Sequence, residues 1–188
     1  MKQLMKQTIT NKNQIPSLPP AWFGFLLVGA FVIFEFYGVF EQYINSYYQN
    51  ADYSYSTYSD YFTLTLVMAI GIWIYWLFCI HRLHKILKIL SNGSHDIKPG
   101  FAVIGHFIPI FNLYWIFHWP NEIAEFVNSK NNRAVIPKGI IGLTILIGFV
   151  ISKIFSAAIG LSILFGVVAY FNKKFDKILV FSDSELIY

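Results

Sequence analysis

YFTLTLVMAIGIWIYWLFCI, residues 61–80, is a run of twenty residues without a single charged side chain. A transmembrane helix needs about 20 consecutive apolar residues to cross a hydrocarbon core about 30 Å thick. A second run, WFGFLLVGAFVIFEFYGVF at residues 22–40, has Glu35 as its only charge. The two runs therefore predict transmembrane helices at about 21–40 and 61–81.

The composition of the whole chain also indicates a membrane protein. Its 188 residues are 56% hydrophobic and 13% charged, whereas soluble domains have roughly 25% charged residues. We expect a polar tail at 1–20 and a single membrane domain at 21–188. Because the first apolar run lacks a small-residue cleavage site, it predicts an uncleaved anchor. The single cysteine, Cys79, excludes a disulfide or a cysteine-based zinc site within one chain.

A third apolar block covers residues 139–171, and Lys153 is its only charge. One continuous helix over this block would be about 50 Å long, far more than one crossing needs. Two crossings joined near Lys153 account for the length better. They predict short spans at about 136–152 and 154–172.

A rival interpretation makes 139–171 one long tilted helix and uses 101–119 as the third span. In its favour, Ser152, Ser156 and Gly160 form a ridge of small residues spaced four apart. Such ridges let helices approach closely, so these three residues are candidate helix-packing positions under either interpretation.

The distribution of basic residues predicts the orientation, because Lys and Arg favour the cytoplasmic side. With both termini and the 81–138 segment in the cytoplasm, thirteen of the fourteen basic residues lie inside and only Lys153 lies outside. This predicts a multi-pass protein of the bacterial inner membrane, next to its anionic inner leaflet. The expected basic cytoplasmic face consists of Arg82, Lys85, Lys88, Lys130, Arg133, Lys173, Lys174 and Lys177.

The segment 81–90, HRLHKILKIL, has an apolar stripe with basic residues facing away from it. Leu83, Ile86, Leu87 and Leu90 form the stripe. This pattern predicts a basic amphipathic helix that leaves the membrane and lies on anionic lipid.

The stretch PGFAVIGHFIPIFNLYWIFHWP, residues 99–120, is apolar but interrupted. Pro109 removes a backbone donor and breaks a helix locally, and non-helical backbone at membrane depth needs cover by protein or water. A full crossing by 101–119 would also place basic residues outside. We therefore expect two short pieces that meet near Pro109–Asn112 as a re-entrant or interfacial element, followed by a cytoplasmic amphipathic helix at 121–129. The predicted fold is an all-α membrane protein with four transmembrane helices and this element between the second and third.

The same stretch resembles a motif in families of uncharacterised bacterial membrane proteins, domains of unknown function with about four spans. The motif falls on Pro99, Gly100, Phe107, Ile108, Pro109, Asn112 and Leu113. The resemblance implies an architecture and no activity. Small multi-span proteins of this size also occur as accessory or effector proteins in bacterial antiphage systems, a class-level hypothesis to which no residue here corresponds.

Charged and polar residues inside apolar segments are the candidate site residues. An acid inside a span costs about 2–3 kcal/mol on insertion scales and is a functional hypothesis by default. Glu35 is such an acid, and because it lies near the outer end of its span it is expected to be exposed at the interface. A pair with Lys153, which is predicted near the same surface, is the alternative. The full candidate set for a polar core or pore is Glu35, His106, Asn112, His118 and Lys153.

The five histidines all lie within residues 81–118, and His81 and His84 have the i, i+3 spacing of one helix face. Histidine is the commonest metal ligand, but no cysteine or carboxylate pattern with zinc spacing accompanies them. The sequence also has no nucleophile elbow, phosphate loop or metalloprotease helix. We therefore expect no enzyme and no metal, cofactor or catalytic site.

Two functions remain compatible with these features. The first is a non-catalytic accessory or regulatory protein that docks a cytoplasmic protein through its basic face and associates with itself. The alternative is a homo-oligomeric pore or channel-forming effector that depolarises the membrane. Nucleic acid is not an expected partner, because membrane topology already explains the basic cytoplasmic side.

Overall fold

The computed structural model describes residues 15–47, 54–130 and 136–184, and every regular element in these ranges is a helix. This confirms the all-α class. The elements are α2 (Ala21–Tyr47), α3 (Ser54–Leu90), α4 (Pro99–Ile104), the 3₁₀ helix η3 (Gly105–Phe107), α5 (Pro109–Lys130), α6 (Ile140–Ile154) and α7 (Ala157–Ser184).

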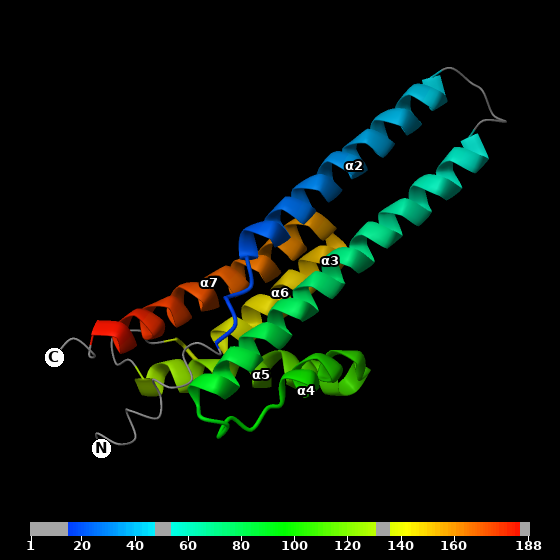
Figure 1. Ribbon diagram of the computed structural model, residues 1–188. Coiled ribbons are helices and arrows are strands. Elements are labelled where there is room, and N and C mark those ends of the chain that lie inside the picture. Colours follow the sequence, from blue (N-terminus) through cyan, green and yellow to red (C-terminus); the bar gives the residue numbers. More distant parts are fainter. Residues whose placement is uncertain (1–14, 48–53, 131–135, 185–188) are drawn as a thin grey trace.

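Two helical hairpins of unequal length build the molecule (Figure 1). The long antiparallel pair α2–α3 extends well past the shorter hairpin α6–α7, which packs against one half of it. The α4–η3–α5 unit lies across the same end, where the described residues also begin and end. We call this the packed end, and we call the opposite end of α2–α3 the free end.

Three helices are long and apolar enough to cross a membrane: Ala21–Ile44, Tyr61–Leu90 and Ala157–Leu179. The apolar helix α6 has 15 residues, about 22 Å of rise, and is therefore shorter than the ~30 Å of hydrocarbon. The described residues thus contain three helices of spanning length and one shorter apolar helix.

The block 139–171 is broken at Phe155–Ser156, between α6 and α7, two to three residues later than expected. The rival prediction of one continuous helix is wrong, because the chain turns back there. The absence of a side chain at Gly160 permits the close return: a Cβ at this position would overlap Ser152 and the Gly148 carbonyl of α6. Ser152 and Gly160 therefore pack against each other within the hairpin, and Ser156 lies in its turn.

The element at 101–119 has the break expected near Pro109, since η3 ends at Phe107 and α5 begins at Pro109. The separate helix predicted at 121–129 is wrong. Pro120 lies inside the continuous helix α5, where it is buried beside Trp119 and Ile123. Losing one backbone hydrogen bond at Pro120 is offset by burying this apolar face.

The segment 81–90 is the last part of α3 and not a separate helix. Leu83, Ile86 and Leu87 are fully buried, and α4 packs directly against α3. The prediction that this stripe lies on lipid is wrong, because α4 and α5 fold back and cover it with protein.

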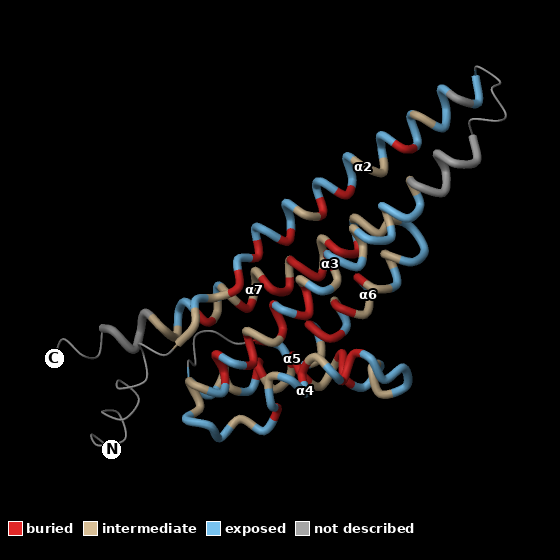
Figure 2. Tube along the Cα trace, turned by 45° about the vertical axis from the view of Figure 1, so that its right-hand side comes forward, coloured by how far each residue is buried: buried red, intermediate tan, exposed pale blue. Residues whose placement is uncertain are grey.

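Burial is concentrated at the packed end (Figure 2). Trp76, Trp115 and Trp119 are at most 1% exposed, whereas Ile33 and Phe36 on α2 are 73% and 78% exposed. The two most apolar spanning stretches, on α2 and α3, are therefore less buried than the less apolar stretch on α7. Such an inversion is typical of a chain whose helices are surrounded by lipid.

Candidate functional site

A cluster of histidine and tryptophan side chains occupies the interior of the packed end. His106 of η3 is 5% exposed, and its Nδ1 lies 2.9 Å from the Ala102 carbonyl oxygen. Trp115 Nε1 donates to the same oxygen, also at 2.9 Å. Because a carbonyl only accepts, His106 donates from Nδ1, and one oxygen joins η3 to α5.

His84 and His95 form the second part of the cluster. His84 of α3 is fully buried, and its Nδ1 lies 3.0 Å from Nε2 of His95, in the turn after α3. One of the two nitrogens donates and the other accepts. At most one of the two imidazole rings can therefore be in its cationic form in this arrangement. The contact fixes the 91–98 turn to α3.

Three buried polar atoms around Trp119 have no partner among the described residues: His84 Nε2, His106 Nε2 and Trp119 Nε1. The ring centroid of Trp119 lies 5.9 Å from that of His84 and 6.3 Å from that of His106. Buried polar atoms left unpaired cost about 1–3 kcal/mol each. The cluster therefore leaves one indole donor and two imidazole nitrogens unpaired in its buried interior.

Burial lowers the pKa of two histidines of this cluster, His106 and His95. Desolvation lowers the pKa of His106 to about 4, against the opposing effect of its backbone hydrogen bonds. Desolvation also lowers the pKa of His95, with the nearby Asp96 carboxylate acting in the other direction. In the described part of the chain, no group of three or more His, Cys, Asp or Glu side chains could hold a metal ion.

The other two candidates on α5 lie near this cluster but do not complete it. The His118 ring stacks on Tyr114 at 5.0 Å between centroids. Asn112 keeps its Oδ1 buried without a partner among the described residues. His106, Asn112 and His118 therefore belong to one unit, α4–η3–α5, but face different neighbours.

Glu35 and Lys153 lie apart from that unit, and no ion pair joins these two described residues. Glu35 accepts from the Tyr61 hydroxyl through its backbone oxygen, at 3.2 Å. The exposed Lys153 lies near the tip of the α6–α7 hairpin. The alternative of a Glu35–Lys153 pair is wrong within the chain, because Glu35 is on α2 and α7 packs between α2 and α6.

The two charges nevertheless lie at similar levels of the bundle. Asn172 of α7 donates to the Pro19 oxygen at 2.7 Å, and Phe165 lies directly over Gly24. In this antiparallel register the turn after Lys153 falls near residue 35 of α2. Each charge is therefore left at that level without a partner among the described residues.

The residues of the predicted basic face gather at the packed end, where α3, α5 and α7 all terminate (Figure 1). Arg82 donates to Ser17, whereas Lys130 and Lys174 lie over the rings of Phe126 and Tyr170. The other described members, Lys85, Lys88, Lys173 and Lys177, are exposed. Arg133 lies outside the described residues.

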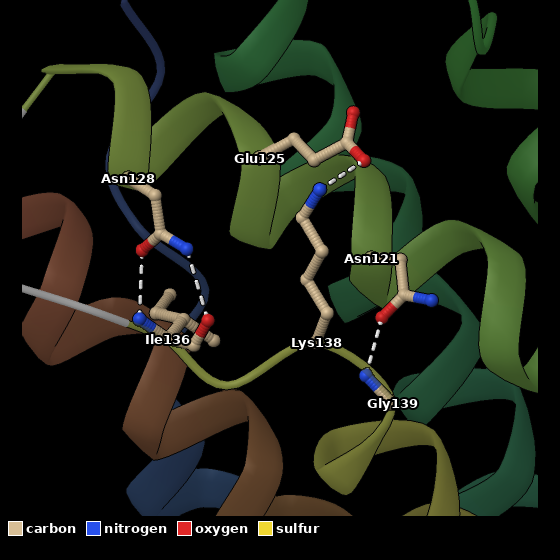
Figure 3. Close-up of polar contacts among 6 residues, drawn as sticks. All are labelled: Asn121, Glu125, Asn128, Ile136, Lys138 and Gly139. Atoms are coloured by element: carbon tan, nitrogen blue, oxygen red, sulfur yellow. Dashed lines mark hydrogen bonds and ion pairs between the residues drawn. The ribbon is translucent and has the colours of Figure 1, made fainter.

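The connection between α5 and α6 has polar anchors that the sequence analysis missed (Figure 3). Asn128 donates to the Ile136 oxygen at 2.9 Å and accepts from the Ile136 nitrogen at 2.7 Å. Asn121 accepts from Gly139 at 2.8 Å. An asparagine on a helix facing a loop gives no distinctive sequence signal, and neither does the His84–His95 contact. The three buried tryptophans could have been found, since large aromatic residues on interrupted helices indicate a packed core.

Comparisons with protein-family models, with curated proteins and with solved structures found no match. The resemblance to bacterial membrane families through the Pro-Gly and Phe-Ile-Pro motif therefore stays a prediction.

Proposed function

We propose that the protein is a non-catalytic accessory or regulatory protein of the bacterial inner membrane that docks an acidic cytoplasmic protein. Both termini would lie in the cytoplasm, and the packed end would face it. In this arrangement α2, α3 and the α6–α7 hairpin enter the bilayer, and α4–η3–α5 lies in the inner interface. A role in antiphage defence is one setting for such a protein.

The observation that carries the proposal is the exposed, uncompensated charge at the end of α7. Lys173 and Lys177 follow the apolar part of α7 and are exposed, and neither forms an ion pair with a described acid. α7 continues to Ser184, beyond the membrane-spanning stretch that ends at Leu179. These lysines lie in the last turns of the Ala157–Leu179 stretch, with the exposed Asp176 between them. This end of α7 therefore has a net positive charge, which favours an acidic partner.

The packed end also has the rigidity that a docking surface needs. Residues 15–20 are attached to both neighbouring helices, through Tyr75 to Pro20 and through Asn172 to Pro19. Because α3, α5 and α7 are joined by a fully buried aromatic core, the exposed lysines are held on a fixed support and lose little freedom on binding.

A photo-crosslinking amino acid placed at Lys177 in living bacteria tests the docking proposal. We expect one dominant protein adduct, which the double substitution Lys173→Glu and Lys174→Glu abolishes. A crosslinker at the lipid-facing Phe36 and the substitution Lys153→Glu are the matched controls. Adducts only with lipid, or equal loss in Lys153→Glu, would contradict docking at this surface.

The alternative, a homo-oligomeric pore, is favoured by one specific observation. Glu35 and Lys153 lie at similar levels of the bundle without partners in the described chain, as residues lining a wet path would. Expression of the protein alone would then depolarise cells, measured with a voltage-sensitive dye, and Glu35→Gln and Asn112→Leu would abolish the effect. An unchanged membrane potential would exclude the pore and leave the docking function.

A further inference from the structure

We propose that α3 carries a binding site for one anionic phospholipid, which holds the headgroup in a cationic cleft and an acyl chain in an adjoining apolar groove. The inference rests on the membrane placement of α2 and α3 but does not depend on a protein partner.

The cationic cleft lies where α3, the following turn and α4 meet. Its volume is about 660 Å³, and its lining includes His81, Lys85 and Lys88 of α3, Asn92 and Gly93 of the turn, and Gly100 of α4. Pockets that hold small ligands usually measure about 300–1,000 Å³. The cleft is thus large enough for a phosphate and its attached polar group.

The charge of this cleft is not balanced by any acid among the described residues. No acidic residue lines it, and Lys85 and Lys88 form no ion pair with a described acid. Asp96, the acid of the adjoining turn, is not part of the lining. By contrast, Lys138 contacts Glu125 at 2.7 Å. Two ammonium groups converging without a counter-charge favour an anionic ligand.

A separate apolar groove of about 580 Å³ lies between α2 and α3. Its lining includes Phe23, Leu27 and Ala30 of α2, and Gly71, Ile74 and Phe78 of α3. Nothing lies within 4 Å of the position that a Cβ at Gly71 would take. The groove is therefore open at Gly71, and its lining is apolar along its length, as a hydrocarbon chain requires.

The groove and the cleft lie in line along α3. Ile74, Phe78, His81, Lys85 and Lys88 are spaced four and three residues apart, which places them on one helix face. Lys85 follows the last residue of the charge-free run, Ile80, by five positions, about 7.5 Å along the helix. The headgroup layer on each side of a bilayer is also about 5–8 Å thick.

An amphiphile with an anionic head and an apolar tail fits this arrangement. The cationic part lies at headgroup level, and the apolar part lies at hydrocarbon level on the same helix face. A free phosphate would use the cleft alone, whereas a lipid would use both. Filling the groove therefore distinguishes the two ligands.

The test is native mass spectrometry of the purified full-length protein with phosphatidylglycerol, and with phosphatidylcholine as the uncharged comparison. Two lysines near a phosphate contribute about 1 kcal/mol each, so Lys85→Ala with Lys88→Ala should weaken phosphatidylglycerol binding about thirtyfold. The matched control, Lys173→Ala with Lys177→Ala, changes the net charge equally but lies outside the cleft and should leave this bound lipid in place.

A second pair of variants tests the groove. Gly71→Leu should fill the groove and displace the lipid, whereas Gly29→Leu, at another helical glycine with open space around it, should not. Equal effects of the two lysine pairs would contradict the cleft. An unchanged affinity in Gly71→Leu, together with competition by soluble glycerol phosphate, would identify a free phosphate and overturn the lipid proposal. Crosslinking at Lys177 is measured separately, so failure of docking and failure of lipid binding can be told apart.

Discussion

The packed end and the free end of the α2–α3 pair use similar residues in opposite ways. At the packed end, large aromatic side chains such as Trp119 and Phe171 are fully buried. Toward the free end, Phe36 of α2 and Phe62 of α3 are 78% and 60% exposed. Side-chain hydrophobicity therefore does not predict which residues form the protein core when lipid is the surrounding solvent.

What determines burial instead is whether a segment carries polar groups that need protein partners. The 99–120 segment has a break at Ile108 between η3 and α5. Within the segment, one Ala102 oxygen accepts from both His106 and Trp115, and the segment packs against α3. The free end has only regular helix, whose backbone groups are paired internally, so it needs no such cover.

The largest difference between the packed end and the free end is expected in the free energy of unfolding when an aromatic side chain is replaced by alanine. Trp119→Ala should lower the free energy of unfolding by about 3–5 kcal/mol, because it leaves a large cavity in the buried core. Phe36→Ala should change it by less than about 1 kcal/mol, since that ring faces outward. Thermal unfolding of the detergent-solubilised protein measures both, and similar losses would show that the free end is packed in the protein.

Lowering the pH should destabilise the packed end, where His106 is buried. The pKa of His106 is lowered from its ordinary value near 6.5 to about 4, so below pH 6.5 the unfolded chain binds more protons than the folded one. The contribution of His106 to stability is therefore full above pH 6.5 and falls by about 3 kcal/mol down to pH 4, at about 1.4 kcal/mol per unit.

Unfolding titrations from pH 7.5 to pH 4 measure this dependence. His106→Asn retains a side-chain donor near the Ala102 oxygen but removes the titrating imidazole. The unfolding free energy of this variant should therefore change less steeply with pH. A slope equal to that of the parent would show that His106 is not the group responsible.

A smaller effect is expected at the α5–α6 connection. Asn128→Ala removes both hydrogen bonds to Ile136 and leaves polar backbone atoms without a partner, which should cost about 1–3 kcal/mol. Asn128→Asp retains the acceptor and should lose less. Hydrogen exchange of the Ile136 amide checks the cause, because protection should fall in the alanine variant and persist in the aspartate variant.

The smallest effect should come from the surface ion pair in the same connection. Lys138 and Glu125 are 57% and 54% exposed, and exposed pairs contribute about 0–1 kcal/mol. Glu125→Gln should therefore change the unfolding midpoint little, and raising the salt concentration should remove the remaining difference. A loss as large as that of Asn128→Ala would mean that the pair is shielded from solvent by lipid.

Part of this architecture could be predicted from the sequence. The charge-free run of α3, the apolar run of α2 and the break before Pro109 all follow from composition and backbone chemistry. Pro120 misled the prediction, because its neighbours Trp119 and Ile123 stabilise a helix that a proline would otherwise end. His84 and His95 lie eleven positions apart, and their contact depends on how α4 folds back, which local patterns do not encode. The lysines of the cationic cleft were identified, but the cleft itself depends on that same folding.

The shortness of α6 has a consequence for the surrounding bilayer. With 15 residues it rises about 22 Å, whereas α2 and α3 match the full ~30 Å of hydrocarbon. The α6 face therefore presents a hydrophobic length about 8 Å shorter than that of α2 and α3, although α7 of the same hairpin is of spanning length. A bilayer relieves such a mismatch by local thinning, so we expect the protein to prefer membranes with shorter acyl chains.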